Sequence, residues 1–332
     1  MNPSLLSDLQ SSFEAKSPAD VAGAHPPRES GAQPAGRKTL GYGESLQPYL
    51  KADTRLSGGI IPEARIRHFT DGMRANAHYF SHPKWMDDWL AAVHRYPQLR
   101  ERWHAAIGTL DDKVLVDLGC GPGNLLATLG GKPKMAIGVD IAMGSLERAA
   151  GVGYVPLLAD AQNTPLASGI ADVVAINGSL HHFDDMQRGL REAARLVRPG
   201  GVLVLDHDPQ KTAWHFRGLA LMLWRLRLPL YRWMQRGGHT AGDNEQQWAL
   251  ATELHHRPGD GVTNELLRST LQPLGFDVDL YPHSHYVGRE VLTGTMGRQP
   301  LKIRFAQRLS GIDPASPEAA LSVLCVATRR RA

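Results

Sequence analysis

Cysteine is scarce in this chain, and several marks of specialised proteins are missing. The 332 residues include only Cys120 and Cys325, too few for a disulfide framework, which favours a reducing compartment. No segment reaches the roughly 18 uncharged apolar residues of a membrane span. Residues 1–16 lack the basic segment and apolar run of a secretion signal, and they contain Asp8 and Glu14. We therefore expect a cytoplasmic protein.

Concentrated charge is also missing. The formal net charge is +4, and the basic residues are spread along the chain except for Arg329, Arg330 and Arg331. A nucleic-acid footprint needs a clustered basic face, so this charge balance neither demands nor excludes one. With 42% hydrophobic and 21% charged residues, the composition is that of a globular protein long enough to bury a sizeable core.

The most informative stretch is KVLVDLGCGPGNLL, residues 113–126. Its apolar run over 114–118 predicts a buried strand of a parallel sheet, and Gly119, Gly121 and Gly123 end that strand before a helix predicted over 124–129. This order of elements places bare backbone and unpaired N–H groups beside a ligand. A nucleotide-like cofactor is expected here.

The spacing of the glycines argues against a pyrophosphate. It is G-x-G-x-G, whereas the dinucleotide fingerprint is G-x-G-x-x-G and the NTPase phosphate loop needs a Lys-Ser or Lys-Thr pair. A second predicted strand, within 135–142, ends near Asp140, where a carboxylate can bind both hydroxyls of a ribose. A third, over 154–158, leads to Asp160 and Ala161, which suit the edge of an adenine.

From about residue 110 to 201 the chain resembles the class I S-adenosylmethionine-dependent methyltransferases, in particular the methyltransferase type 11-like small-molecule subgroup with the signature D-x-G-x-G-x-G. The resemblance rests on Asp117 and the glycines, on Asp140 and Asp160, on Asn177 after a fourth predicted strand, and on Pro199-Gly200-Gly201 before a fifth. It implies an α/β fold, a Rossmann-like seven-stranded sheet with an antiparallel last strand. It also implies S-adenosyl-L-methionine as the cofactor.

The resemblance further implies which residues bind that cofactor. Asp117 would lie near its ammonium group, Asp140 would bind the ribose, Ile141 would pack on the adenine, and Asn177 would line the methionyl end. The complete implied set is Asp117, Gly119, Cys120, Gly121, Gly123, Asp140, Ile141, Asp160, Ala161 and Asn177.

Composition and periodicity divide the chain into five parts. Residues 1–40 are rich in Ser, Pro, Ala and Gly, which predicts a disordered tail. Residues 41–110 predict a helical cap, 111–206 the cofactor-binding core, 207–262 a helical insertion, and 263–332 the rest of the core with a second insertion. Within the cap, Tyr79 and Phe80 either touch the cofactor or belong to the core of the cap.

The segment 212–236 has apolar residues around most of its predicted helix, among them Trp214, Phe216, Trp224 and Trp233, with arginines between them. Pro229 is expected to break or kink this helix. Three interpretations stay open: a lid over the acceptor pocket, a helix at a membrane surface, and a homodimer contact.

Methyl transfer from a sulfonium is an in-line displacement, so alignment alone can supply roughly 7–11 kcal/mol of the barrier. His181 and His182 follow the fourth predicted strand at the sheet edge where ligands bind. They are the candidate catalytic residues, acting as a base or shaping the pocket wall. Two other groups lack a tight ligand motif, so we expect no metal; they are Glu253 with His255 and His256, and His283 with His285.

Motifs of nucleic-acid methyltransferases are missing after the fourth strand. The run there is Asn177-Gly178-Ser179-Leu180, without the Pro-Pro-aromatic motif of amino-group enzymes, and neither cysteine is placed as in cytosine-C5 enzymes. The sequence therefore favours a methyltransferase for a small organic acceptor in specialised metabolism, with no nucleic-acid partner. Two alternatives stay open: a quinone or lipid methyltransferase at a membrane surface, and a non-catalytic interaction module with the same fold.

Overall fold

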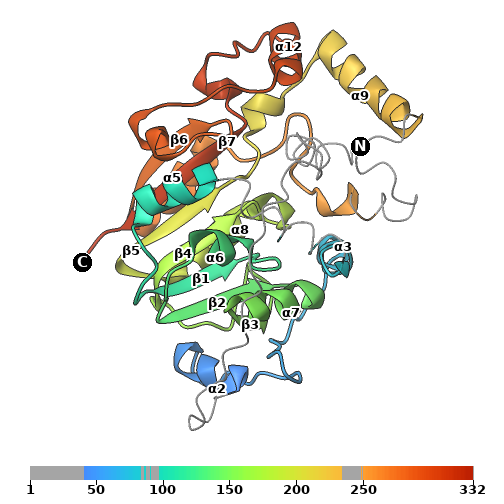
Figure 1. Cartoon of the computed structure of the whole chain (residues 1–332). Coiled ribbons are helices and arrows are strands. Elements are labelled where there is room, and N and C mark those ends of the chain that lie inside the picture. The colour runs from blue at the N-terminus through green and yellow to red at the C-terminus, as the bar shows by residue number, and fades with distance from the viewer. Residues whose placement is uncertain are drawn as a thin grey trace, which may run out of the picture.

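The computed structural model describes residues 41–83, 86, 90, 97–233, 248 and 250–331. The tail predicted to be disordered, residues 1–40, lies outside these ranges, as does most of the stretch 84–96 within the predicted helical cap. The strands among these residues form a single seven-stranded sheet (Figure 1). Within the described residues, no helix combines the length and the apolar character needed to cross a membrane.

The strands follow the order β3-β2-β1-β4-β5-β7-β6. Strands β1 to β5 pair in parallel, and β7 runs antiparallel to both β5 and β6, which confirms the predicted fold class. β5 begins before residue 202, where the sequence predicted its start, because the turn Pro199-Gly200-Gly201 is part of the strand. The strands are β1 Val114–Leu118, β2 Met135–Asp140, β3 Val155–Leu158, β4 Ala171–Asn177, β5 Val197–Asp206, β6 Phe276–His283 and β7 Ser322–Arg329.

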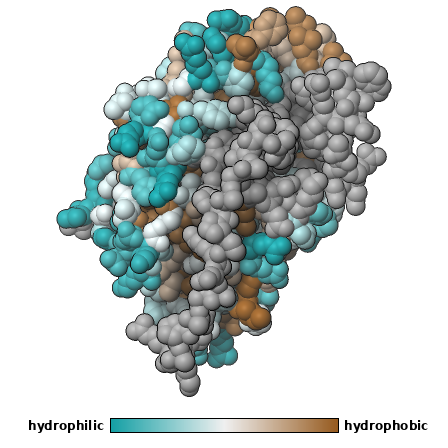
Figure 2. Space-filling view, in the orientation of Figure 1, coloured by the Kyte–Doolittle hydropathy of each residue, from teal (hydrophilic) through white to brown (hydrophobic). Residues whose placement is uncertain are grey.

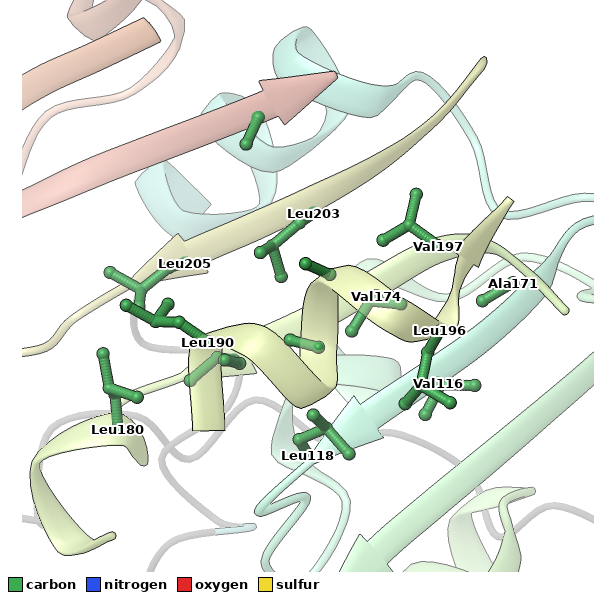
Figure 3. Close-up of a cluster of buried hydrophobic side chains, with 14 of the residues drawn as sticks. Val116, Leu118, Ala171, Val174, Leu180, Leu190, Leu196, Val197, Leu203 and Leu205 are labelled. Carbon is green, nitrogen blue, oxygen red and sulfur yellow. The ribbon is translucent and has the colours of Figure 1, made fainter. Parts of the chain in front are cut away.

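Helices cover both faces of the sheet. Because side chains alternate along β1, Val116 and Leu118 join the core on one face, and Leu115 joins the core on the other. Leu190 and Leu196 of α8 lie on the side of that helix that faces β1, β4 and β5 (Figure 3). The helices of the core are α6 Asn124–Leu129, α7 Met143–Val152, α8 Met186–Leu196 and α11 Asn264–Leu271, with the short η4 Leu180–His182 after β4.

A helical cap precedes the sheet, as predicted. Its described helices are α2 Tyr42–Leu46, η2 Gln47–Tyr49, α3 Asp71–Tyr79 and α5 Pro97–Ile107. Thr70 caps α3 by accepting a hydrogen bond from the N–H of Met73 at 3.0 Å. Trp103 of α5 is fully buried in the core on the α6 and α7 side of the sheet.

The two insertions after β5 and β6 pack on each other (Figure 1). The first contains η5 Lys211–Trp214 and α9 Gly218–Trp233, and the second contains η8 Arg289–Thr293 and α12 Leu301–Leu309. Trp214, Phe216 and Trp224 are buried against Ile303 and Ala306 of the second insertion. These aromatic residues are therefore covered by α12, a partner that the sequence pattern did not identify.

Helix α9 differs from its prediction in two ways. It begins at Gly218 and not at residue 212, where the apolar segment starts. Residues 211–214 form a separate short helical turn, η5. It also continues past Pro229 to Trp233, so the expected break is wrong. A proline inside a helix removes one backbone hydrogen bond, and the packing of α9 on α12 can offset that loss. The sequence pattern also predicts a helix over 245–256; of its described residues, 248 and 250–252 are helical, whereas 253–256 are not, so the predicted end is too late.

Candidate active site

A cavity of about 320 Å³ lies where the carboxyl ends of the parallel strands meet the cap. All the cofactor-binding residues predicted from the sequence line it except Gly123. Those that do are Asp117, Gly119, Cys120, Gly121, Asp140, Ile141, Asp160, Ala161 and Asn177, and His181 and His182 line it as well. The structure therefore brings the residues predicted to bind the cofactor and the two candidate catalytic histidines to one cavity.

Two of the glycines are required for different reasons. Gly119 has φ +75°, and a Cβ there would lie 2.5 Å from the Cβ of Ser179. The loops after β1 and β4 thus pack directly on each other, and the Ser179 hydroxyl donates a hydrogen bond to the Leu118 carbonyl at 2.7 Å. Gly123, with φ +99°, caps α6, and a Cβ there would lie 3.1 Å from Val152 of α7. It serves helix packing and does not line the cavity.

Asp140 is held at the end of β2 by two backbone donors. Its Oδ2 accepts a hydrogen bond from the N–H of Gly121 at 2.8 Å, and its Oδ1 accepts one from the N–H of Ala142 at 2.9 Å. Burial raises the pKa of this carboxyl, and these hydrogen bonds oppose the rise. A carboxylate has about four acceptor positions, so each oxygen retains one for a hydroxyl group. This geometry fits the ribose that the family cofactor carries.

Asp117 is a buried carboxyl with one free oxygen. The Tyr154 hydroxyl donates a 2.6 Å hydrogen bond to its Oδ2, whereas its buried Oδ1 has no hydrogen-bond partner among the described residues. Burial raises the pKa of Asp117 to about 7, against the effect of the Tyr154 hydrogen bond. An unpartnered buried oxygen beside a cavity fits a cationic donor such as an ammonium group. Sequence analysis did not identify Tyr154 as a site residue, because its role depends on its contact with Asp117, 37 residues away in the chain.

The loop after β3, which lines the cavity, is held by hydrogen bonds that connect it to helix α8. Asp160 accepts a hydrogen bond from the N–H of Gln162 at 2.8 Å, and the Gln162 side chain accepts one from the N–H of Asp185 at 2.8 Å. Asp185 is the N-cap of α8, so the loop is attached to that helix. Asp160 and Ala161 both line the cavity, as an adenine edge would require.

The cap closes one wall through α3. Met73, Asn76 and Phe80 line the cavity, whereas Tyr79 is buried and does not. The Ser145 hydroxyl of α7 donates a 2.6 Å hydrogen bond to the Phe80 carbonyl, which attaches this end of α3 to the core. The ring of Phe80 lies edge-on to that of His182, with centroids 5.1 Å apart. Of the two aromatic residues considered from the sequence, Phe80 is therefore the one that can touch a ligand.

The two candidate catalytic histidines are held in fixed orientations. The Nδ1 of His181 lies 2.7 Å from Oδ1 of Asp208, which also accepts the His181 N–H. The Nδ1 of His182 lies 2.8 Å from the carbonyl of Thr252, an acceptor only, so Nδ1 carries the proton. Burial lowers the pKa of both imidazoles to about 4, which leaves them neutral at pH 7. In each ring Nε2 then remains as the basic atom.

Glu253 enters the same wall from the insertion after β5. Its Oε2 lies 2.8 Å from Nδ1 of His256 and 3.8 Å from Nε2 of His181. Burial raises the pKa of Glu253, but the His256 hydrogen bond and the neighbouring histidines outweigh burial and lower it to about 2. Sequence analysis singled out Glu253 and His256 but missed Asp208, whose only signal is its position just after β5.

A second buried network lies beside the cavity around Asp206. Its carboxylate accepts hydrogen bonds from Nε of Arg102 at 2.7 Å, Nε1 of Trp103 at 2.8 Å and Nε2 of His283 at 2.8 Å. His283 is thus a hydrogen-bonded core histidine. The next residue, His207, has φ +64° and lines the cavity. Its Nδ1 lies 3.2 Å from Oδ1 of Asn177.

Comparison with known proteins gives matches centred on this region. Residues 116–205 match the family model described as "Methyltransferase domain". A demethylmenaquinone methyltransferase of Mycolicibacterium vanbaalenii is 37% identical over 94 residues, covering 28% of this chain and 41% of the relative. The 27-O-demethylrifamycin SV methyltransferase of Amycolatopsis mediterranei is 31% identical over 133 residues, covering 37% and 49%. The chain spans about half of these curated relatives or less.

Among solved structures, a geranyl diphosphate C-methyltransferase from Streptomyces coelicolor A3(2) aligns with a TM-score of 0.47 and 12% identity, over 80% of this chain and 100% of that one. The family match covers β1 to β5 with the glycine loop and Asp140. This match and the sheet order identify the region from β1 to β5 as a class I S-adenosylmethionine-dependent methyltransferase domain, whose cofactor is S-adenosyl-L-methionine.

Proposed function

We propose that the chain transfers a methyl group from S-adenosylmethionine to a small organic acceptor, with donor and acceptor bound in one cavity. The observation that carries this proposal is the division of the cavity wall. Asp140, Asp160 and the free oxygen of Asp117 lie on the side of β1 to β3, whereas His181 and Glu253 lie on the side of β4 and the insertion.

The cofactor would be held by three carboxyl groups with different tasks. Asp140 would bind the ribose hydroxyls, Asp160 with the backbone of Ala161 would bind the adenine edge, and Asp117 would pair with the ammonium group. When bound, S-adenosylmethionine supplies an activated methyl group on a positively charged sulfur. The protein's main task is then to align the acceptor with that group, which supplies roughly 7–11 kcal/mol of the barrier.

The acceptor side of the cavity offers neutral imidazoles. His182 presents Nε2 as a proton acceptor because Thr252 fixes its Nδ1 proton. His181 is oriented in the same way by Asp208. With a pKa near 4, such a base suits acceptors whose acidic proton leaves readily, and it leaves most of the work to alignment.

Calorimetric titration with S-adenosylhomocysteine, the demethylated cofactor, tests the binding half of the proposal. The native chain should bind one molecule, and Asp140→Ala should weaken binding by roughly tenfold or more, since it removes hydrogen bonds to a charged group worth about 1.5–3 kcal/mol. Asp277→Ala, on β6 and exposed, is the matched control and should bind like the native chain. An unchanged dissociation constant in Asp140→Ala would remove the ribose assignment.

We also propose that the insertion 207–262 acts as a lid over the acceptor. Supporting this, Glu253 lines the cavity and Thr252 holds His182, whereas the aromatic side chains of Trp214 and Trp224 are buried against α12. The lid would therefore contact the acceptor through residues 250–257. Changes there should alter the acceptor KM or kcat and leave cofactor affinity unchanged. A parallel loss of cofactor affinity would argue against the lid.

A second candidate function is methyl transfer to a quinone or lipid at a membrane surface. Exposed apolar side chains gather on α9 and α12, and Leu301 is 79% and Phe305 60% exposed. The rest of this apolar face consists of Leu219, Met222, Leu223, Leu226 and Leu309. Figure 2 shows brown, hydrophobic residues at this end of the molecule. Neither helix sequence contains Asp or Glu, while Arg217, Arg225, Lys302 and Arg308 flank the face.

Sedimentation with anionic and zwitterionic phospholipid vesicles tests this second function. Binding should be selective for the anionic vesicles, weaken with salt, and be lost in the double variant Met222→Glu with Phe305→Glu. Ile60→Glu is the matched control, because Ile60 is 85% exposed on the cap, away from α9. If the native chain does not bind vesicles, and sedimentation velocity shows that the native chain is a dimer and the double variant a monomer, the apolar face is a contact between two copies of the chain.

A further inference from the structure

Three ligand-type side chains converge at the wall of the cavity. His181 from η4, and Glu253 and His256 from the insertion, are all buried, and each can place one ligand atom within 4.8 Å of the other two. Their chain positions explain why the sequence predicted no metal. Glu253 and His256 lie in a segment without regular helix, and His181 comes from a distant turn, so no motif with ligand spacing forms.

The distances within this cluster suit coordination to one ion. Bonds from zinc to imidazole nitrogen and carboxylate oxygen are about 2.0–2.2 Å, so neighbouring ligand atoms around a tetrahedral ion lie roughly 3.3–3.6 Å apart. The Oε2 of Glu253 lies 2.8 Å from Nδ1 of His256 and 3.8 Å from Nε2 of His181. These two values lie on either side of the expected separation, and side-chain movements of a few tenths of an ångström bring both to it.

The hydrogen bonds around the cluster leave it electron-rich. Since Nδ1 of His181 donates to Asp208, its Nε2 lone pair points toward the Glu253 carboxylate, and two acceptors face each other. A cation between Nε2 of His181 and Oε2 of Glu253 would satisfy both of these acceptors. At His256 the ion would replace the Nδ1 proton that Glu253 Oε2 accepts, and that proton would move to Nε2, which is buried and has no partner among the described residues. The Asp208–His181 pair also matches the carboxylate–histidine arrangement that orients metal-bound imidazoles.

We propose that His181, Glu253 and His256 bind a divalent metal ion such as Zn²⁺, and that Asp208 orients the His181 ring for this role. Two imidazoles and one carboxylate are a typical donor set for such an ion, and three protein ligands leave a position open. His181 and Glu253 line the cavity, so the open position faces it. There the ion would take an oxygen atom of the acceptor, a hydroxyl or a carbonyl. That last role, unlike the metal binding, rests on the proposed methyl transfer.

The test uses the full-length chain, stripped with a chelator and titrated with Co²⁺ as a spectroscopic probe. One Co²⁺ should bind per chain with the visible d–d bands of four- or five-coordination, and Zn²⁺ should displace it. Glu253→Gln and His256→Asn should each lower the affinity at least 100-fold, and Asp208→Asn should lower it 10- to 100-fold. His255→Asn, which removes an imidazole from the same segment outside the cluster, should retain native affinity.

The outcomes separate this proposal from methyl transfer. Thermal melts and circular dichroism establish that each variant is folded, and S-adenosylhomocysteine binding is measured on the metal-free chain. If no Co²⁺ bands appear, or if His256→Asn binds Co²⁺ as tightly as the native chain, the metal site is wrong even where S-adenosylhomocysteine binds. If the Co²⁺ spectra appear as expected and S-adenosylhomocysteine does not bind, the metal site stands and the proposed methyl transfer fails.

Discussion

Cofactor affinity should depend on pH through Asp117. Burial raises the pKa of this carboxyl to about 7 in the free protein, whereas an ammonium group beside it favours the ionised form. The ligand therefore binds the deprotonated protein, and affinity is lost as pH falls below 7. The dissociation constant should rise about tenfold for each pH unit well below this pKa, and about 25-fold between pH 7.5 and 5.5. The α-amino group of the ligand stays charged in this window, because it belongs to a free amino acid and titrates above the peptide α-amino range of about 7.7–8.0.

Calorimetry with S-adenosylhomocysteine in two buffers of different ionisation enthalpy measures both the affinity and the protons released. At pH 6 the native chain should release close to one proton per ligand bound. Asp117→Asn should bind more weakly at pH 7.5 and lose most of the pH dependence. Tyr154→Phe removes the hydrogen bond that opposes the rise in pKa, so its profile should shift to higher pH.

Asp277→Asn is the control for removing an exposed carboxyl, and its profile should match that of the native chain. The reasoning fails if Asp117→Asn keeps the full pH dependence of the native chain. It also fails if the native dissociation constant is flat between pH 5.5 and 7.5.

Three further predictions concern the same region. Gly119→Ala should lower the free energy of unfolding by roughly 2–4 kcal/mol in urea melts, because its Cβ would overlap Ser179, whereas Gly121→Ala, with open space around it, should cost only about 1–2 kcal/mol of backbone strain. His182→Asn should reduce kcat about 10²-fold or more and remove a kinetic pKa near 4, because Nε2 of His182 is free to accept a proton whether or not His181 binds a metal ion; a near-native rate across pH 4 to 9 would mean that the site works by alignment without a base. The pKa of Asp117 is higher in the folded than in the unfolded chain, so Asp117 contributes stability that is lost as pH rises from about 4 to 7. Asp117→Asn should therefore flatten the fall in melting temperature over that range. An unchanged slope would refute the raised pKa of Asp117.

Local patterns predicted the first strands of the sheet, and the family resemblance supplied the seven-stranded fold and most of the residues that line the cavity. The strands β1, β2 and β4 have apolar runs that end at or beside a carboxylate or amide, and parallel strands bring those ends to one edge. Asp140, Asp160 and Asn177 could therefore be placed together from the sequence alone. Gly123 was grouped with them by its spacing, although it serves the packing of α6 on α7.

The acceptor side could not be predicted in the same way, because contacts between distant segments create it. The distance between His181 and Glu253 depends on how the insertion returns to β4, and Asp208 acts only because its carboxylate meets η4. The pairing of α9 with α12 is a similar case. Each helix is amphipathic or apolar by itself, and only their packing decides which aromatic residues are buried.

Methyl transfer itself is tested most directly with a methyl-deuterated donor. The native chain is incubated with S-(trideuteromethyl)adenosylmethionine and an extract of small molecules and lipids from the cells that naturally produce it, and products are analysed by mass spectrometry. A product that carries the trideuteromethyl group should appear with the native chain and Asp277→Ala, and be absent with Asp140→Ala. If the native chain binds S-(trideuteromethyl)adenosylmethionine but all of the trideuteromethyl label stays in that donor, the chain is a cofactor-binding interaction module and the proposed transfer is contradicted.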